Sequence, residues 1–433
     1  MATTFDRTHT DKLLSFLRDS PTPFHAVDEA AVRLEVAGFS RLDETESWGD
    51  YAAVGARYAV RGGALVAWYL PPGAEAERPF RILGSHTDSP NLRVKPRPDT
   101  GALGWRQVAV EIYGGPLYNS WLDRDLGLAG RLVLRDGDEQ LVNIDRPLLR
   151  VPQLAVHLDR GVNAEGLKLN AQHHLLPIWG LGDAHEGDLI AFVAAEHNLR
   201  AADVIGWDLM TYDLTAPAYL GREAEFVAGA RIDNLASVHA SVAALTAAVA
   251  EGPLPADAPI PVIAAMDHEE TGSDSYTGAG GPFLESVLER LLEARGGGSE
   301  ARARAYAGSF VCSADMSHAV HPNYSERHDG TNRPRPNGGP ALKVNVNQRY
   351  ATTGRGQAVW ARACERAGVP WQTFVSRNDL PCGTTIGPIT ATRLGIETLD
   401  VGVPGLSMHS VRELCGADDP WLLANALTAF LAG

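Results

Sequence analysis

Seven acidic and histidine side chains between residues 86 and 409 have the types that hydrolysis on two adjacent cations requires. Such a site needs imidazole and carboxylate ligands, one carboxylate that bridges the cations, and a base that takes a proton from water. No single motif is decisive, but together they predict one two-metal site. The candidates are His86, Asp88, Asp233, Glu269, Glu270, Asp315 and His409.

Each candidate has an ordinary explanation when it is taken alone. In the triplet from His86 to Asp88, the carboxylate can accept the second imidazole N–H and orient the ring, yet most such triplets are surface or turn residues. Asp233 opens a helical pattern, so it could equally be a helix N-cap. Glu269 and Glu270 follow an apolar strand pattern, where one can bind a metal while the other acts as the base; a solvated loop would explain the pair as well.

The remaining candidates follow a strand or a turn. Asp315 comes directly after an apolar strand pattern, and His409 follows a turn region at residues 402–405. Taken alone, His409 reads as a packed histidine, and we interpret His318 and His321 as ordinary loop residues. Independent coincidences at five positions are less plausible than one shared site, so we predict a metal centre.

Hydrophobic periodicity predicts the elements that position these motifs. Helical and strand patterns alternate, which favours an α/β sheet covered by helices on both faces. Ligands bind beyond the carboxyl ends of strands in such sheets, so one cleft can hold all the motifs. Strands are predicted at residues 58–70 (a pair around the turn 61–63), 80–83, 261–266, 310–314 and 397–401, and helices at 13–17, 26–34, 236–250, 283–294 and 358–367.

The pattern of apolar and polar residues changes between residues 95 and 221. Residues 107–113 and parts of 130–142 alternate apolar and polar side chains, and helical periodicity is weak. We therefore predict a strand-rich inserted domain at 95–221, which divides a first domain made of residues 1–94 and 222–433. A chain of 433 residues is long enough for two such domains.

The charge and the cysteine content of the chain indicate which kinds of binding partner and cellular location to expect. The formal net charge is −15, which argues against nucleic acid or an anionic membrane and means that an acidic substrate needs a local cationic pocket. The four cysteines are dispersed and form no C-x-x-C pair. The first 20 residues have no signal-peptide core, and no apolar run approaches membrane-spanning length. We expect a cytoplasmic protein.

Several longer segments have a distinctive sequence. They are Gly84-Ser85-His86-Thr87-Asp88-Ser89-Pro90, Asp267-His268-Glu269-Glu270-Thr271-Gly272-Ser273, Asp315-Met316-Ser317-His318-Ala319-Val320-His321-Pro322-Asn323-Tyr324, Pro381-Cys382-Gly383-Thr384-Thr385-Ile386-Gly387-Pro388 and Met408-His409-Ser410. They resemble the aspartyl aminopeptidase family of zinc metallopeptidases. The match runs from the segment at residues 20–25 nearly to the C-terminus.

The resemblance implies a fold and an assembly. It implies an α/β proteolytic domain interrupted by a β-rich dimerisation domain, in agreement with the insertion predicted above. It also implies a homo-oligomer built from dimers, typically a tetrahedral dodecamer whose active sites face an inner chamber.

Residue roles follow from the same resemblance. One metal would be held by His86, Asp233 and Asp315, and a second by Asp233, Glu270 and His409, with Asp233 as the bridge. Glu269 would be the general base, and Asp88 would orient His86. His157 matches a histidine that reaches a neighbouring subunit's site, and Lys343 and Tyr350 match positions linked to substrate binding and transition-state stabilisation.

Two departures concern the rim of the pocket. Thr271 stands where the family commonly has valine, and residues 275–278 differ from the usual continuation. They affect the expected substrate preference more than the expected chemistry.

The predicted function is removal of N-terminal residues, preferentially Asp or Glu, from peptides with a free N-terminus. The predicted cofactors are two divalent ions per subunit, with zinc expected and Co²⁺ or Mn²⁺ also compatible with these ligands. Lys343 would pair with the substrate carboxylate, unless it is simply a surface lysine. The sequence is also compatible with a dizinc aminopeptidase with a neutral-residue preference, with another dizinc hydrolase, and with a non-catalytic assembly subunit.

Overall fold

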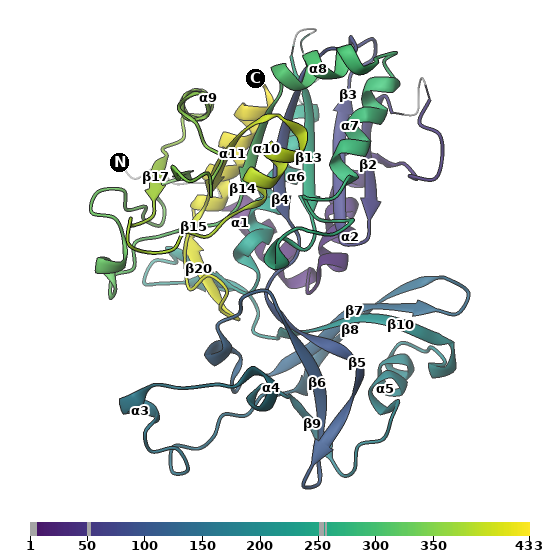
Figure 1. Ribbon diagram of the computed structural model, residues 1–433, viewed down its shortest axis with the longest axis vertical. Helices are drawn as coiled ribbons and strands as arrows, with labels where there is room; N and C mark the ends of the chain where they lie inside the picture. Colours follow the sequence, from purple (N-terminus) through teal and green to yellow (C-terminus); the bar gives the residue numbers. More distant parts are fainter. Residues whose placement is uncertain (1–6, 50–52, 251–254, 256–257) are drawn as a thin grey trace.

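The computed structural model describes residues 7–49, 53–250, 255 and 258–433 and shows a mixed α/β fold with three sheets (Figure 1). The predicted α/β class is confirmed. Residues 1–6, 50–52, 251–254 and 256–257 belong to the predicted first domain and lie outside the described residues.

A central sheet of nine strands organises the molecule, in the order β1-β2-β3-β13-β4-β14-β18-β16-β17. The neighbouring strands β13, β4, β14 and β18 run parallel, so their carboxyl ends meet at one edge. The bounds are β1 Ser40–Arg41, β2 Gly55–Arg61, β3 Ala64–Leu70, β13 Ile260–Met266, β4 Phe80–His86, β14 Phe310–Ala314, β18 Glu397–Gly402, β16 Ala341–Val344 and β17 Gln372–Val375.

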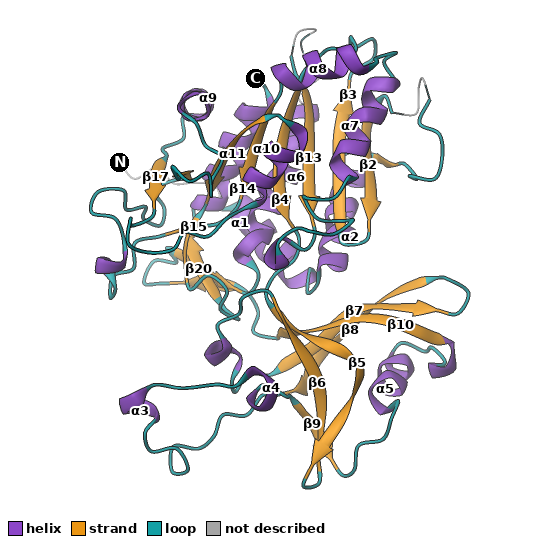
Figure 2. Ribbon diagram, in the orientation of Figure 1, coloured by secondary structure: helices purple, strands orange, loops and turns teal. Residues whose placement is uncertain are grey.

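Helices cover both faces of this sheet (Figure 2). Side chains alternate between faces along each strand: Leu65 and Ala67 pack in one core, and Val66 and Trp68 pack in the other. On the first face lie α1 Thr8–Asp19, α2 Pro23–Val36, α6 Ile232–Ala250, α9 Gly354–Ala367 and α11 Asp419–Leu431; on the second lie α7 Phe283–Glu293, α8 Ser299–Gly308 and α10 Ile386–Leu394.

Helix α6 corrects one sequence expectation. By length and composition it is long and apolar enough to cross a membrane, with 19 residues and a mean hydropathy of 1.3. However, 72% of that window is buried inside the fold, where α6 packs on the sheet and on α11. Its apolar character is therefore that of a core helix.

A second sheet lies below the central one in Figure 1. Its six strands are antiparallel, in the order β8-β7-β10-β5-β6-β9, and they enclose a separate core that includes Leu92, Leu128 and Leu209. This sheet begins at Asn91 rather than at residue 95. The bounds are β5 Asn91–Ala102, β6 Trp105–Tyr113, β7 Leu126–Leu134, β8 Glu139–Leu149, β9 Ile178–Leu181 and β10 Val204–Asp213, with helices α3 Val162–Glu165, α4 Ala171–His174 and α5 Asp188–Glu196.

A third sheet of five strands joins segments from distant parts of the chain, in the order β11-β12-β20-β19-β15. The bounds are β11 Ala218–Leu220, β12 Phe226–Gly229, β20 Glu413–Gly416, β19 Pro404–Leu406 and β15 Ser317–His318. Periodicity predicted none of these short strands. Helix α8 was also not predicted, because Ala305 is its one buried residue and it has no apolar stripe to detect.

Candidate metal centre

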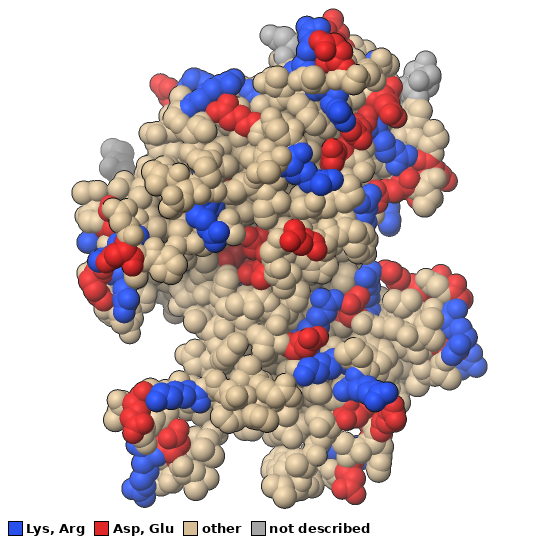
Figure 3. Space-filling view, viewed as in Figure 1, with Lys and Arg blue, Asp and Glu red and all other residues tan. Residues whose placement is uncertain are grey.

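Three parallel strands deliver the first group of candidate side chains to one edge of the central sheet. His86 is the last residue of β4, and Asp315 directly follows β14. After β13 the chain turns through His268, whose φ is +59°, into a 3-10 helix at Glu269–Thr271. The space-filling view shows acidic side chains gathered in a recess between this edge and the second sheet (Figure 3).

Two histidines face the two oxygens of one carboxylate. His86 Nε2 lies 3.3 Å from Asp233 Oδ1 and 3.4 Å from Asp315 Oδ1. His409 Nε2 lies 3.7 Å from Asp233 Oδ2 and 3.3 Å from Glu270 Oε2. The five predicted ligands are therefore brought together, and the carboxylate of Asp233 lies between the two histidine groups.

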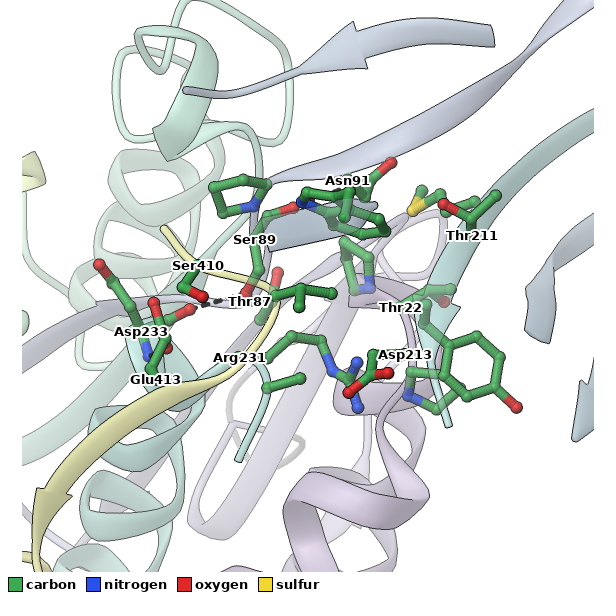
Figure 4. Close-up of a pocket in the computed structure, with 18 residues that line it drawn as sticks. Thr22, Thr87, Ser89, Asn91, Thr211, Asp213, Arg231, Asp233, Ser410 and Glu413 are labelled. Atoms are coloured by element: carbon green, nitrogen blue, oxygen red, sulfur yellow. Dashed lines mark hydrogen bonds between the residues drawn. The ribbon is translucent and has the colours of Figure 1, made fainter. Parts of the chain in front are cut away.

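Asp233 does not behave as a simple helix cap. It and Asn234 have non-helical φ/ψ angles inside α6, and Ser89 Oγ donates to the Asp233 carbonyl at 2.7 Å (Figure 4). Among the described residues, the buried Asp233 Oδ1 and Glu270 Oε1 have no hydrogen-bond partner. Such atoms are costly unless they bind something. Candidate ligand atoms of His86, Asp233 and Glu270 all lie within 4.8 Å of one another, which suits a cation.

Asp88 lies behind His86 and is fully buried. Its Oδ1 is 3.3 Å from His86 Nδ1, and its oxygens accept the backbone N–H groups of Glu269 and Glu270 at 3.1 Å each. The Tyr113 hydroxyl donates to Asp88 Oδ2 at 2.7 Å. Sequence reasoning missed Tyr113, because its place at the end of a predicted strand carries no sign of this contact.

The charges of this cluster shift several pKa values. Burial opposes a proton on His86, but its contacts with Asp233, Asp315 and Asp88 outweigh burial and raise the pKa of His86 well above its ordinary value. Burial, together with nearby carboxylates, raises the pKa of Glu269 to about 8. The same causes raise the pKa of Glu270. Protein charges alone therefore leave an excess of carboxylates, which a bound divalent cation would offset.

Lys343 is not a surface lysine, because only 2% of it is exposed. Its Nζ donates to the Met316 carbonyl at 2.8 Å and lies 3.3 Å from Asp315 Oδ2. The same nitrogen lies 4.9 Å from the centre of the Tyr350 ring, and Tyr350 is itself 3% exposed. The structure thus brings Lys343 and Tyr350 to the edge of the cluster through Asp315.

His157 lies apart from the other candidates. It is exposed on the segment between β8 and α3, beside the exposed side chains of Leu154, Val156 and Leu158. Within the described residues of one subunit, no contact joins it to the metal cluster. His318, interpreted as an ordinary loop residue, packs its ring against Phe374 at 5.4 Å between centroids.

The second sheet also contacts the cluster within the same chain. His409 Nδ1 faces the Gly115 carbonyl at 3.0 Å, and Leu117 N donates to the His409 carbonyl at 3.0 Å. The last residue of β6, Tyr113, contacts Asp88, and the segment that follows contacts His409. This part of the chain therefore supports candidate residues of both histidine groups. These supports come from backbone atoms or a single hydroxyl, which explains why no sequence motif indicated them.

Comparison with known sequences decides the family. The profile described as "Aminopeptidase I zinc metalloprotease (M18)" matches residues 16–431. The chain belongs to the M18 family of zinc aminopeptidases. It is 67% identical over 429 residues to "Probable M18 family aminopeptidase 2" of Streptomyces coelicolor, covering 99% of this chain and 98% of that protein. It is 46% identical over 426 residues to the protein of the same name from Mycobacterium leprae, covering 97% of each.

Solved M18 structures share the fold. The chain in the cryo-EM structure of the Ape4 and Nbr1 complex has a TM-score of 0.94 and 37% identity, covering 98% of this chain and 85% of that one. The S. cerevisiae mApe1 dodecamer has a TM-score of 0.85 and 28% identity, covering 98% of this chain and 96% of that one. The predicted resemblance is therefore confirmed at the level of the family: the protein is an M18 zinc metallopeptidase of the aminopeptidase class.

Proposed function

We propose that this M18 protein is a dizinc aminopeptidase that removes N-terminal residues, preferentially Asp or Glu, from peptides. One observation carries the two-metal part of the proposal: the two carboxylate oxygens of Asp233 face two different histidines, His86 and His409. A carboxylate that faces two ligand groups in this way is suited to bridge two cations.

The distances support the two ligand sets that the resemblance implies. His86, Asp233 and Asp315 would hold one ion, and Asp233, Glu270 and His409 would hold the other. When bound, the two ions supply Lewis acidity toward the scissile carbonyl and make water a stronger acid. The M18 family indicates zinc, and imidazole with carboxylate also accepts Co²⁺ or Mn²⁺.

Glu269 is the proposed general base. Its carboxylate lies 3.9 Å from His86 Nε2 and is 13% exposed, so it borders the cluster and still faces the recess. It takes a proton from the hydrolytic water and returns it to the leaving amine. Asp88 keeps the Nδ1 side of His86 occupied, which directs Nε2 toward Asp233 and Asp315.

The acidic preference depends on Lys343 and Tyr350. Lys343 has three N–H donors, of which Asp315 and Met316 accept two, so one remains for the carboxylate of a substrate side chain. The ring of Tyr350 lies beside Lys343, and its hydroxyl is the proposed donor to the oxyanion. The ion pair with Asp315 also favours a second candidate, a dizinc aminopeptidase with a neutral-residue preference, because it already engages the lysine.

The assembly is proposed to be a cytoplasmic homo-oligomer, with the M18 dodecamer as the expected form. The segment that carries His157 presents Leu154, Val156 and Leu158 with 57%, 49% and 75% exposure. Exposed apolar side chains in this number indicate a contact surface. A neighbouring subunit covering them would place His157 near that subunit's recess, and residues 95–221 would then act as the dimerisation domain.

Initial rates on aspartyl, glutamyl, leucyl and N-acetyl-aspartyl chromogenic amides test the proposal, before and after chelation and metal restoration. We expect metal-restorable cleavage of the free aspartyl and glutamyl substrates and none of the acetylated one. Faster leucyl cleavage would support the neutral preference. No cleavage of any free-amine substrate, despite bound metal, would contradict the aminopeptidase assignment.

Lys343→Met separates specificity from metal binding. We expect a far larger loss with an acidic substrate than with a leucyl one, because only the former uses the free N–H donor. Equal losses, with reduced metal content, would mean that Lys343 serves Asp315 alone.

A further inference from the structure

Glu413 is a buried carboxylate that holds the backbone of two candidate ligands. It is the first residue of β20, and 3% of it is exposed. Its Oε2 accepts the backbone N–H of Asp233 at 2.8 Å, and its Oε1 accepts the backbone N–H of His409 at 2.8 Å. Figure 4 shows Glu413 next to Asp233. One side chain therefore joins two ligands that are far apart in the sequence.

The third sheet explains how Glu413 reaches both segments. Strand β20 pairs with β12, and Glu413 lies opposite Gly229. After Gly229 the chain turns through Arg231, whose φ is +60°, and enters α6 at Ile232. The carboxylate thus faces the chain where it turns toward Asp233, while His409 precedes the same strand. Neither contact depends on the second sheet.

The position is an unfavourable one for a negative charge. Among the described residues, no lysine or arginine forms an ion pair with Glu413; buried Arg231 acts on it only at longer range, and the carboxylate of Asp233 is nearby. A buried anion without a cationic partner is destabilising unless other groups compensate. Backbone N–H donors compensate in part, and two cations held by the neighbouring ligands would compensate further. A neutral side chain would avoid this cost but could not accept two N–H groups through equivalent oxygens.

We propose that Glu413 is a positioning residue that fixes Asp233 and His409 relative to each other. This inference rests on the proposed two-metal function. His86 and Asp315 have separate supports in Asp88 and Lys343. Glu413 therefore acts mainly on the second ion, whose ligands are Asp233, Glu270 and His409, and much less on the first.

Glu413→Gln tests the role with almost no change in shape. The amide can accept at its oxygen but not at its nitrogen, so one of the two backbone N–H groups loses its acceptor. The matched control is Asp419→Asn. Asp419 is also a fully buried carboxylate that accepts two backbone N–H groups, from Asn337 at 2.7 Å and Gly339 at 3.0 Å, but it touches no candidate ligand.

The measurement is stepwise Zn²⁺ binding to the metal-stripped full-length protein by competition with a chromogenic chelator. For Glu413→Gln we expect one of the two dissociation constants to rise about 10-fold or more, and the other to change by less than about 3-fold. Asp419→Asn should leave both constants unchanged. Should Glu413→Gln fail to fold, Glu413→Asp is measured instead, with the same expected order and a smaller rise.

Distinct outcomes separate this inference from the function on which it rests. Two bound ions in the wild type, with both constants unchanged in Glu413→Gln, would refute the positioning role alone. An equal rise of both constants, matched by Asp419→Asn, would show a general loss of structure and also refute it. A single ion in the wild type would instead overturn the two-metal proposal.

Discussion

Replacement of Glu269 by Gln should have opposite effects on catalysis and on the stability of the metal-free protein. The side chain of Glu269 accepts no hydrogen bond among the described residues, and its backbone N–H remains bound to Asp88. The substitution therefore removes a charge and a base while leaving the fold in place. Loss of a general base lowers turnover by about 10²- to 10⁴-fold.

The stability effect follows from the raised pKa of Glu269. Burial and nearby carboxylates raise this pKa from 4.5 to about 8. When the pKa of a carboxyl group is higher in the folded protein than in the unfolded chain, the group ionises at a lower pH in the unfolded chain. The free energy of unfolding therefore falls as pH rises above the pKa of the unfolded chain. The penalty grows between pH 4.5 and 8 and is complete above pH 8, where it is on the order of 5 kcal/mol.

The assay compares wild type and Glu269→Gln by turnover of an aspartyl amide, zinc content and thermal unfolding after chelation. We expect collapsed turnover with two ions still bound. In the chelated proteins, the melting temperature of the variant should exceed that of wild type at pH 8 and converge with it near pH 4. Near-wild-type turnover would refute the base assignment, and a variant that is no more stable at pH 8 would refute the electrostatic reasoning.

Three further predictions concern supporting residues. Tyr113→Phe removes the 2.7 Å hydrogen bond to the buried Asp88 and should lower the free energy of unfolding by about 1.5–3 kcal/mol in urea titrations; an unchanged midpoint would contradict this. His157→Ala should be nearly inactive alone, but mixing its subunits with Glu269→Gln subunits should restore activity, because some sites then combine both intact residues; no recovery would argue against a site shared between subunits. Burial lowers the pKa of His25 from 6.5 to about 4. Because the unfolded chain then binds the proton more readily, the folded protein loses about 3 kcal/mol of stability as pH falls from 6.5 to 4. His25→Gln should flatten that part of the pH profile of the unfolding free energy.

Much of the candidate site could be predicted because its ligands follow strands. The apolar runs before His86, Glu269 and Asp315 are detectable by composition, and parallel strands bring their carboxyl ends together. Long motifs then indicated the family, which the comparisons confirm. Asp233 and His409 were candidates from their residue types, and the resemblance supplied their expected ligand roles; the structure places both beside these strand ends.

Local pattern could not show how the ligands are supported. Tyr113, Lys343 and Glu413 lie in ordinary strands, and their contacts with Asp88, Asp315 and Asp233 join residues separated by 25 to 180 positions. A lysine in sequence is most simply a surface residue, and only the packing of β16 against β18 buries Lys343 beside Asp315.

The sequence by itself determined the chemical types at the site, the alternation of strands and helices, and the family, because these depend on residue identity and short-range periodicity. Only the tertiary structure decided which oxygen of Asp233 faces which histidine and which buried groups hold the ligands. Those arrangements arise when distant segments pack together and their polar atoms must find partners away from water.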